Sequence, residues 1–164
     1  MAKVRRYHIG YRAIEHDDIP PDTITQDQIA DNEIQTVVEI PLLVGAAQSV
    51  AADATGTPVF PHTAQKLRSE HLKHLKSAEL LLDFEWAATA DGTIQLYDET
   101  DGAVLAETSS FTGGESDDDL IISVTGTLKA GNRIVVRANI TTAGASGETA
   151  TLYRAILKLI LGVS

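Results

Sequence analysis

The chain of 164 residues contains no cysteine, and this absence excludes several kinds of chemistry. Without a thiol there is no disulfide framework, no thiolate nucleophile and no iron–sulfur cluster, and a zinc site would have to use histidine and carboxylate ligands alone. Aromatic residues are also scarce, at 5% of the chain with a single tryptophan. So few rings disfavour a sugar-cleaving cleft, which depends on them.

Long apolar runs are missing as well. No run reaches the roughly 18 residues that a membrane-spanning helix needs. The N-terminal sequence MAKVRRYHIGYR is basic, but the apolar stretch of a secretion signal does not follow it. We therefore expect no membrane span and no signal peptide.

The charge is strongly negative, with 23 acidic against 13 basic side chains and a net charge of −10. This balance argues against a general nucleic-acid-binding protein, which needs a basic face. Two basic stretches stand out, the tip at residues 3–12 and the segment 61–76, whose net charge is +3. Nucleic acid and the acidic N-terminal segment of another copy are both candidate partners for these stretches.

Isoleucine recurs at every fifth position near the N-terminus. The five residues are Ile14, Ile19, Ile24, Ile29 and Ile34. An interval of five makes no stripe on a helix and switches faces on a strand, and Pro20 with Pro21 excludes a helix through the first half. Acidic residues lie between the isoleucines. We therefore predict an extended N-terminal arm over residues 1–35.

These isoleucines need an apolar partner. A pentapeptide solenoid could turn them inward, but five units make little more than one coil, and solenoids need several stacked coils. Packing on the chain's own domain is a second possibility. We favour a third, in which three arms lie around one axis and bury the isoleucines against one another. The five isoleucines are then the predicted oligomer contacts.

The arm also resembles known proteins. Residues 22–34, DTITQDQIADNEI, are similar to the phrase I-T-x-x-x-I-A-D-x-x-I of trimeric phage fibres, spikes and virion appendages. The resemblance implies a trimeric virion component that is made in the host cytoplasm. Its N-terminal arm would bind other virion proteins, and its C-terminal domain would face outward.

Residues 36–164 are predicted to form an all-β domain. A first strand at 36–44 contains Pro41 and is therefore expected near a sheet edge. A loop follows, with a short strand around Val59 and Phe60. Residues 63–76 have apolar side chains at helical spacing and predict a short helix, with a bent strand as the alternative.

The clearest strand covers residues 79–86, where apolar and polar side chains alternate. Its core face is expected to carry Leu80, Leu82, Phe84 and Trp86. Its opposite face is expected to carry Leu81, Asp83 and Glu85. Other residues predicted for the same core are Ile94, Leu96, Ile134, Val136 and Ile140.

Two hairpins and a closing strand complete the predicted domain. The first hairpin joins 93–97 to 103–107 through the turn Asp101-Gly102, because this dipeptide adopts a positive φ easily. The second joins 120–127 to 134–140. The closing strand covers 149–161. The inward residues expected in it are Tyr153, Ala155, Leu157, Leu159 and Leu161.

About eight strands with frequent turns predict an antiparallel β-sandwich of the jelly-roll kind with one short helix. The stretch 80–160 resembles the small jelly rolls of viral capsid and turret proteins and of the tumour necrosis factor and C1q group. In those proteins a turn similar to GTLKAGNRIVV, residues 126–136, joins two late strands. Carbohydrate-binding modules contain similar sandwiches.

Several side chains could carry chemistry, but each has a simpler interpretation. His62, His71 and His74 could approach one another, yet their basic surroundings repel a metal ion. Asp83 and Glu85 lie about 7 Å apart on one strand face, a spacing that overlaps that of glycosidase carboxylates, but a cleft with aromatic rings is missing. We interpret all five as solvated.

Two further motifs fall short of known sites. The acidic run 115–119 could hold calcium, but it lacks the spacing of an EF-hand loop and is interpreted as a surface turn. Ser146 lies in GASG rather than in a G-x-S-x-G elbow, and no phosphate-binding loop occurs in the sequence. The sequence therefore predicts no enzyme, no metal site and no cofactor.

The function we expect is that of a non-enzymatic virion structural protein, a capsid accessory, turret, spike or fibre-head subunit that forms a homo-oligomer, above all a trimer. A carbohydrate-binding module and a single-jelly-roll capsid shell protein are the alternatives. The expected partners are other copies of the chain and other virion proteins, with a host surface glycan as a further candidate. Sugar binding needs an exposed ring, whereas Trp86 is expected in the core.

Overall fold

The computed structural model describes residues 35–43 and 46–162. The five periodic isoleucines lie outside these residues, so their role as oligomer contacts stays a prediction. Nine strands and one short helix follow one another in the described part. The elements are β1 (Gln35–Pro41), β2 (Gln48–Ala51), β3 (Gln65–Lys66), α1 (Ser69–Leu72), β4 (Leu75–Glu85), β5 (Asp91–Asp98), β6 (Ala103–Glu107), β7 (Ser116–Ser123), β8 (Arg133–Thr142) and β9 (Thr149–Gly162).

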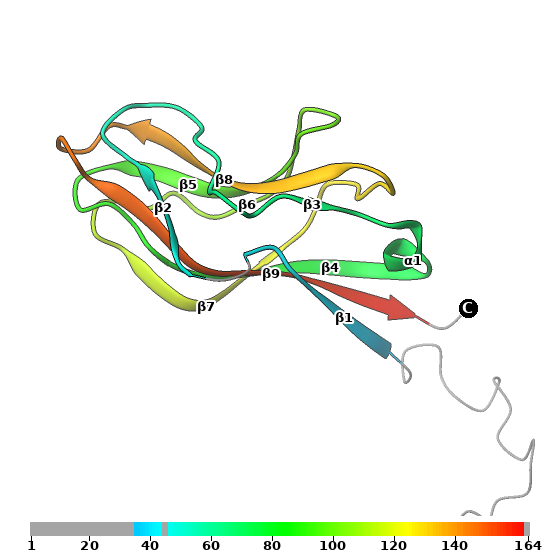
Figure 1. The fold of residues 1–164 in the computed structure, drawn as a ribbon. Helices are drawn as coiled ribbons and strands as arrows, with labels where there is room; N and C mark the ends of the chain where they lie inside the picture. The colour runs from blue at the N-terminus through cyan, green and yellow to red at the C-terminus, as the bar shows by residue number, and fades with distance from the viewer. Residues whose placement is uncertain (1–34, 44–45, 163–164) are drawn as a thin grey trace, which may run out of the picture. The chain divides into compact units, whose positions relative to one another are not determined.

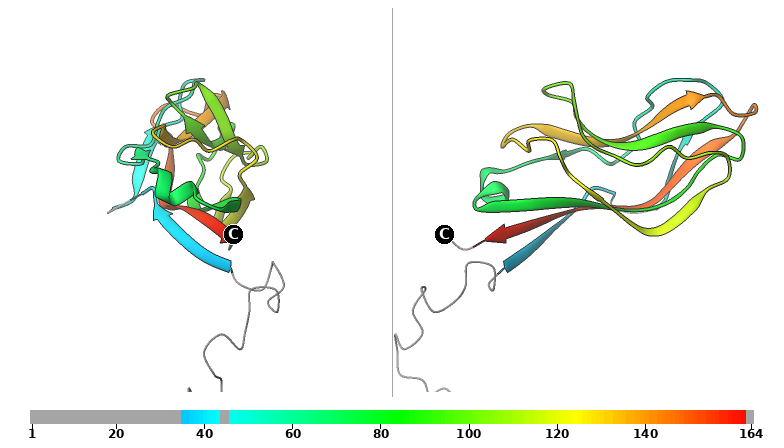
Figure 2. Two further views of the ribbon diagram at one scale, coloured as in Figure 1. Left: turned by 90° about the vertical axis from the view of Figure 1, so that its right-hand side faces the viewer. Right: turned by 180° about the vertical axis from the view of Figure 1, so that it is seen from behind.

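Two antiparallel sheets pack face to face, as expected (Figures 1 and 2). Sheet A has the strand order β1-β9-β4-β7, and β2 pairs with the first part of β9. Because β4 occupies the other side of β9, β1 and β2 lie one after the other along the same edge. Sheet B has the order β3-β8-β5-β6.

The connections are those of a jelly roll. The chain runs out through β2, β3, β4 and β5 and returns through β6, β7, β8 and β9. In this ribbon β2 pairs with β9, β3 with β8, β4 with β7 and β5 with β6. When this long antiparallel ribbon folds into two sheets, β4 also pairs with β9 and β5 with β8. The predicted double-sheet jelly roll is therefore confirmed.

The core lies between the sheets and contains the predicted side chains. All nine residues expected there are at most 2% exposed. They come from β4, β5 and β8 and from Trp86, which directly follows β4. Burial of each large apolar side chain stabilises the fold by about 1.5 to 3 kcal/mol, so inward alternation on these strands explains why the sheets stay together.

The first predicted hairpin is confirmed and the second is wrong. β5 and β6 pair through a turn at Gly102, whose φ is +69°. β7, however, belongs to sheet A and β8 to sheet B, so residues 124–132 cross between the sheets. β7 also begins at Ser116, inside the acidic run that the sequence suggested was a turn.

The segment 63–76 contains both predicted structures in short form. The two-residue strand β3 precedes α1, and β4 starts at Leu75. The helix is a single turn because Lys73 is already extended and His74 takes a φ of +61°, which redirects the chain into β4. The short strand expected near Val59 is present only as a bridge to Arg137 of β8.

The closing strand β9 is confirmed, but Tyr153, which was predicted to face the core, points outward. Ala155, Leu157 and Leu159 are buried, whereas Tyr153 is 49% exposed. β4 pairs its residues 83 and 84 with residues 154 and 152 of β9, so that Tyr153 is an extra residue in a β-bulge. A one-residue bulge reverses the alternation that precedes it, and Leu152 faces the core instead.

Candidate assembly surface

The outer face of sheet A, which points away from the core, carries its side chains in ordered rows. Neighbouring antiparallel strands align residue by residue, and side chains two positions apart along a strand share a face. A row can therefore cross β1, β9, β4 and β7 in that order. Successive rows lie about 6.5 to 7 Å apart.

One row is apolar on all four strands. Pro41 pairs with Ile156, Ile156 with Leu81, and Leu81 with Ile121. Ile121 is 54% exposed, Pro41 is exposed, and the two central side chains are half-buried. None of the four belongs to the core or packs against it. We call these four residues the apolar row.

Charged and apolar rows alternate on this face. A shorter apolar pair, Val37 with Ile160, lies four positions away along β1 and β9, and Val37 is 49% exposed. Between the two apolar rows runs a charged row in which Lys158 pairs with Glu39 on one side and Glu79 on the other. The Nζ atom of Lys158 lies 3.1 Å from a carboxylate oxygen of Glu79.

A cluster of three charged groups borders the apolar row on its other side. The guanidinium of Arg154 lies 2.8 Å from both carboxylate oxygens of Asp83 and also contacts the carboxylate of Asp119. The backbone N–H of Asp119 donates to Asp83 at 2.7 Å. The hydrogen bond that Arg154 donates to Asp83, followed by the one that it donates to Asp119, raises the pKa of Arg154, which therefore stays charged.

The exposed ring of Tyr153 lies next to this cluster. Its hydroxyl donates to Glu85 at 2.8 Å. This hydrogen bond to a carboxylate raises the pKa of the Tyr153 hydroxyl, because ionisation would remove the donated proton. The bulge at Tyr153 therefore presents an aromatic ring, rather than another aliphatic side chain, beside the charged cluster.

The outer face of sheet B is polar and differs sharply from that of sheet A. Gln95, which is 5% exposed, accepts from Arg137 at 2.7 Å and donates to Glu107 at 2.6 Å. The guanidinium of Arg137 stacks 3.4 Å from the ring centre of Tyr97. Glu107 also accepts from Thr93, and these two hydrogen bonds, that from Thr93 first, lower the pKa of Glu107.

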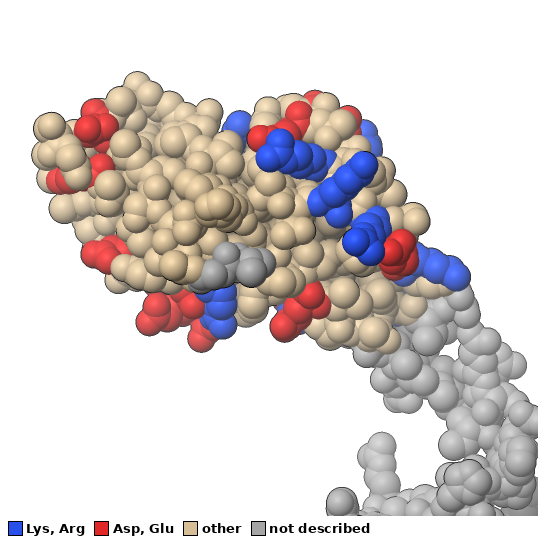
Figure 3. Space-filling model, viewed as in Figure 1, with Lys and Arg blue, Asp and Glu red and all other residues tan. Residues whose placement is uncertain are grey.

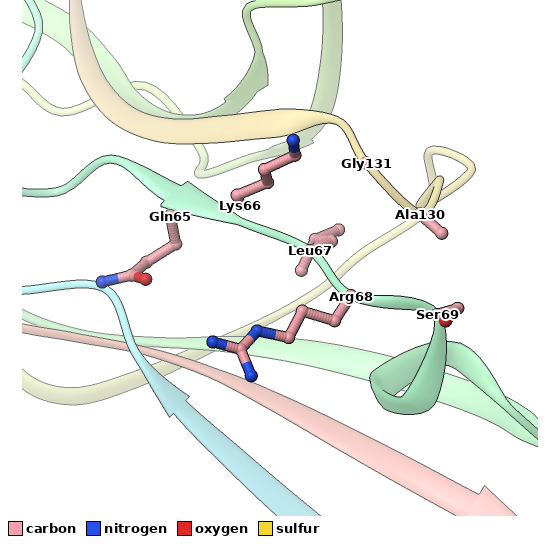
Figure 4. A pocket seen from close by; sticks show the side chains of 7 residues that line it. All are labelled: Gln65, Lys66, Leu67, Arg68, Ser69, Ala130 and Gly131. Carbon is pink, nitrogen blue, oxygen red and sulfur yellow. The ribbon is translucent and has the colours of Figure 1, made fainter.

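Basic side chains gather at the end of the sandwich where α1 lies, on the right of Figure 3. A groove of about 580 Å³ opens there between β3 and the loop that precedes β8 (Figure 4). It is lined by Gln65, Lys66, Leu67, Arg68, Ser69, Ala130 and Gly131. This end contains β3 and α1, which belong to the segment 61–76 with its net charge of +3.

The structure does not bring the histidines together as a site. His71 lies in α1, but the helix ends at Leu72, so His74 does not share a helix face with it. Among the described residues no three His, Asp or Glu side chains are placed to hold a metal ion.

The other candidate groups are also accounted for. Asp83 and Glu85 lie on the outer face as predicted, and they bind Arg154 and Tyr153 respectively instead of standing free. Residues 117–119 form part of β7, and Ser146 lies in the loop before β9. No described helix is long and apolar enough to cross a membrane.

Sequence reasoning did not identify the apolar row. The alternation in residues 79–86 places Leu81 on the outward face together with two acids, and an outward leucine on an otherwise charged face is the one signal available in the sequence. Its alignment with Ile156 and Ile121 depends on strand register, which joins residues far apart in the chain. Comparisons with protein-family models, curated proteins and solved structures found no match to this chain.

Proposed function

We propose that the protein is a non-enzymatic structural subunit of a virion that assembles as a homo-oligomer, with the outer face of sheet A as a contact surface. The observation that carries this proposal is the apolar row. A sandwich with a complete core gains nothing from four further apolar side chains on its outer face unless another surface covers them. A second copy of the chain is the occupant we propose.

The size of the face suits such a contact. Four strands spaced about 4.8 Å apart and rows extending over some 25 Å give an area on the order of 500 Å² for each copy. Two copies would bury roughly 1,000 Å², which is the lower limit for a specific interface. The charged rows on both sides of the apolar row provide the polar rim that stable interfaces have.

The number of copies in the oligomer and the virion role are proposed on other grounds. Three copies are proposed because the periodic isoleucines outside the described residues need several chains around one axis. In a cyclic trimer each outer face of sheet A meets a different surface of its neighbour. The jelly-roll topology, which viral capsid domains share with lectins, agrees with the resemblance of the sequence to virion proteins. Because fold alone does not establish function, assembly is what must be tested.

The test is the mass of the protein in solution, measured by light scattering after size exclusion. We expect a multiple of the 17.5 kDa monomer at micromolar concentration. The variant Ile121→Glu should weaken association about 100-fold, because it places a charge in the apolar row of a dehydrated contact. Ile121 is 54% exposed, so the domain itself should remain folded.

A matched control is available on the other sheet. Val104 is 42% exposed on β6, and Val104→Glu makes the same kind of change away from the proposed contact. This variant should assemble as the parent does. A parent protein that is monomeric throughout the micromolar range would overturn the proposal, and equal weakening by both variants would show that the effect is not specific to sheet A. Electron microscopy of the oligomer separates a closed shell from a discrete appendage.

Glycan binding is the second candidate, because Tyr153 presents a half-exposed ring beside Glu85 and Asp83. Sugar rings stack on such aromatic faces while carboxylates accept their hydroxyl protons. If this function holds, glycans should shift the NMR signals of the Tyr153 ring, and Tyr153→Phe should bind more weakly. Absence of any shift at millimolar glycan would exclude this site.

A further inference from the structure

The end of the sandwich where α1 lies, here called the basic end, carries a group of exposed cationic side chains (Figure 3). Three cationic side chains, Lys66, Arg68 and Lys73, are exposed on β3, beside it and directly after α1. Arg68 lies 3.6 Å from Glu70, with both side chains more than 60% exposed, so solvent screens this pair strongly. Lys66 and Lys73 have no ion-pair partner among the residues that the structure describes.

Backbone hydrogen bonds join the two segments that line the groove at this end. The N–H of Leu67 donates to the carbonyl of Asn132, and the N–H of Gly131 donates to the carbonyl of Leu67. Leu67, which is buried, also lines the groove. In Figure 4 the side chain of Lys66 extends to one side of this segment and that of Arg68 to the other, and both residues line the groove.

The chain itself contains a segment of matching charge. Residues 13–34 include seven Asp and Glu side chains and neither Lys nor Arg. The proline pair excludes a helix through the first half of the N-terminal arm, and an extended acidic peptide would suit an open groove between a strand and a loop.

We propose that the groove and its flanking lysines bind the acidic segment 13–34 of a neighbouring copy. This inference rests on the proposed homo-oligomer and gives it a second contact, in which Lys66 and Lys73 pair with carboxylates of the partner copy. Because surface ion pairs are screened by salt, this contact should weaken between low and high ionic strength.

Zero-length cross-linking tests the contact directly. A carbodiimide joins an ammonium to a carboxylate only when the two touch, and a mixture of ¹⁴N- and ¹⁵N-labelled full-length chains distinguishes links within a copy from links between copies. We expect mixed-isotope links from Lys66 or Lys73 to carboxylates of residues 13–34. Links within one copy only, links to the acidic strand residues 117–119, or no links in an oligomeric sample would each overturn the proposal.

Charge variants give an independent readout. Lys66→Gln with Lys73→Gln should raise the dissociation constant of the oligomer about tenfold at low salt and reduce its salt dependence. The control, Thr142→Glu with Ser146→Glu, changes the net charge by the same amount at exposed positions outside the basic end. Equal effects of the two pairs would contradict a local contact. A monomeric parent refutes the proposed function itself, and an oligomer without these links refutes only the docking.

Discussion

Arg154 on β9 holds the carboxylate of Asp83 on β4 with two contacts of 2.8 Å each. Asp83 lies at the level where both neighbouring strands bulge. β9 inserts Tyr153 there, and β7 opposes Asp83 with two residues, of which Asp119 has a φ of +67°. The bulges re-aim side chains toward Asp83, which receives donors from both strands. This contact therefore ties three strands of sheet A together.

A double-mutant cycle should detect this link as coupling between the two side chains. We expect Asp83→Asn and Arg154→Met each to lower the free energy of unfolding, with a combined effect smaller than the sum because both variants remove the same hydrogen bond and ionic contact. Urea unfolding at neutral pH measures it. Lys158 and Glu79, joined by one 3.1 Å contact, should give a smaller coupling in the same experiment. Equal couplings would mean that the two-point geometry adds nothing.

The core prediction concerns Trp86. This side chain is 2% exposed, its indole N–H donates to the carbonyl of Ala90 at 2.9 Å, and its ring lies 5.4 Å from that of Phe111. Trp86→Ala should reduce the free energy of unfolding by about 3 to 5 kcal/mol, whereas Trp86→Phe should cost less because it retains a ring. If Trp86→Ala melted within a degree of the parent, the ring could not be part of the core.

Local alternation predicted the parts of the fold that depend on one strand at a time. The pattern in residues 79–86 and 134–140 gave the inward faces of β4 and β8, because a regular strand turns every second side chain to the same side. The dipeptide Asp101-Gly102 gave the first hairpin for the same local reason, since glycine adopts the positive φ that the turn requires.

The sequence did not predict what depends on two strands at once. Tyr153 belongs to the apolar pattern of β9, and only the register with β4 reveals the bulge that turns it outward. The apolar row is similarly invisible, because Leu81, Ile156 and Ile121 come from three separate strands. The second hairpin failed because a nine-residue connection, 124–132, is long enough to reach the opposite sheet.

Stability should depend on pH through Glu107. Hydrogen bonds from Thr93 and Gln95 hold its pKa below the ordinary 4.5. A lowered pKa in the folded state stabilises the fold above the unfolded-state pKa, and this contribution is lost as the pH falls through the folded-state pKa. Glu107→Gln should therefore cost up to about 1 kcal/mol at neutral pH, since solvent screens the site, and progressively less as the pH falls below the ordinary pKa of 4.5.

Urea unfolding at several pH values checks this, with Asp118→Asn as the comparison because it removes an exposed carboxylate from β7. The difference in the free energy of unfolding between the parent and Glu107→Gln should become smaller as the pH is lowered from 5 to 3. A constant difference over that range would assign the loss to packing rather than to ionisation.

The last prediction concerns the periodic isoleucines, and it separates an assembly role from a passive segment. Replacing Ile19, Ile24, Ile29 and Ile34 together by serine should weaken association strongly, because each isoleucine buried between copies contributes up to about 1.5 to 3 kcal/mol. The sandwich has its own core, so its urea unfolding should change little. A chain that begins at Thr36 should likewise stay folded but lose oligomer stability. Light scattering over a dilution series measures the association of both variants. If both assemble as the full chain does, the isoleucine period has no part in assembly, and the face of sheet A must carry it alone.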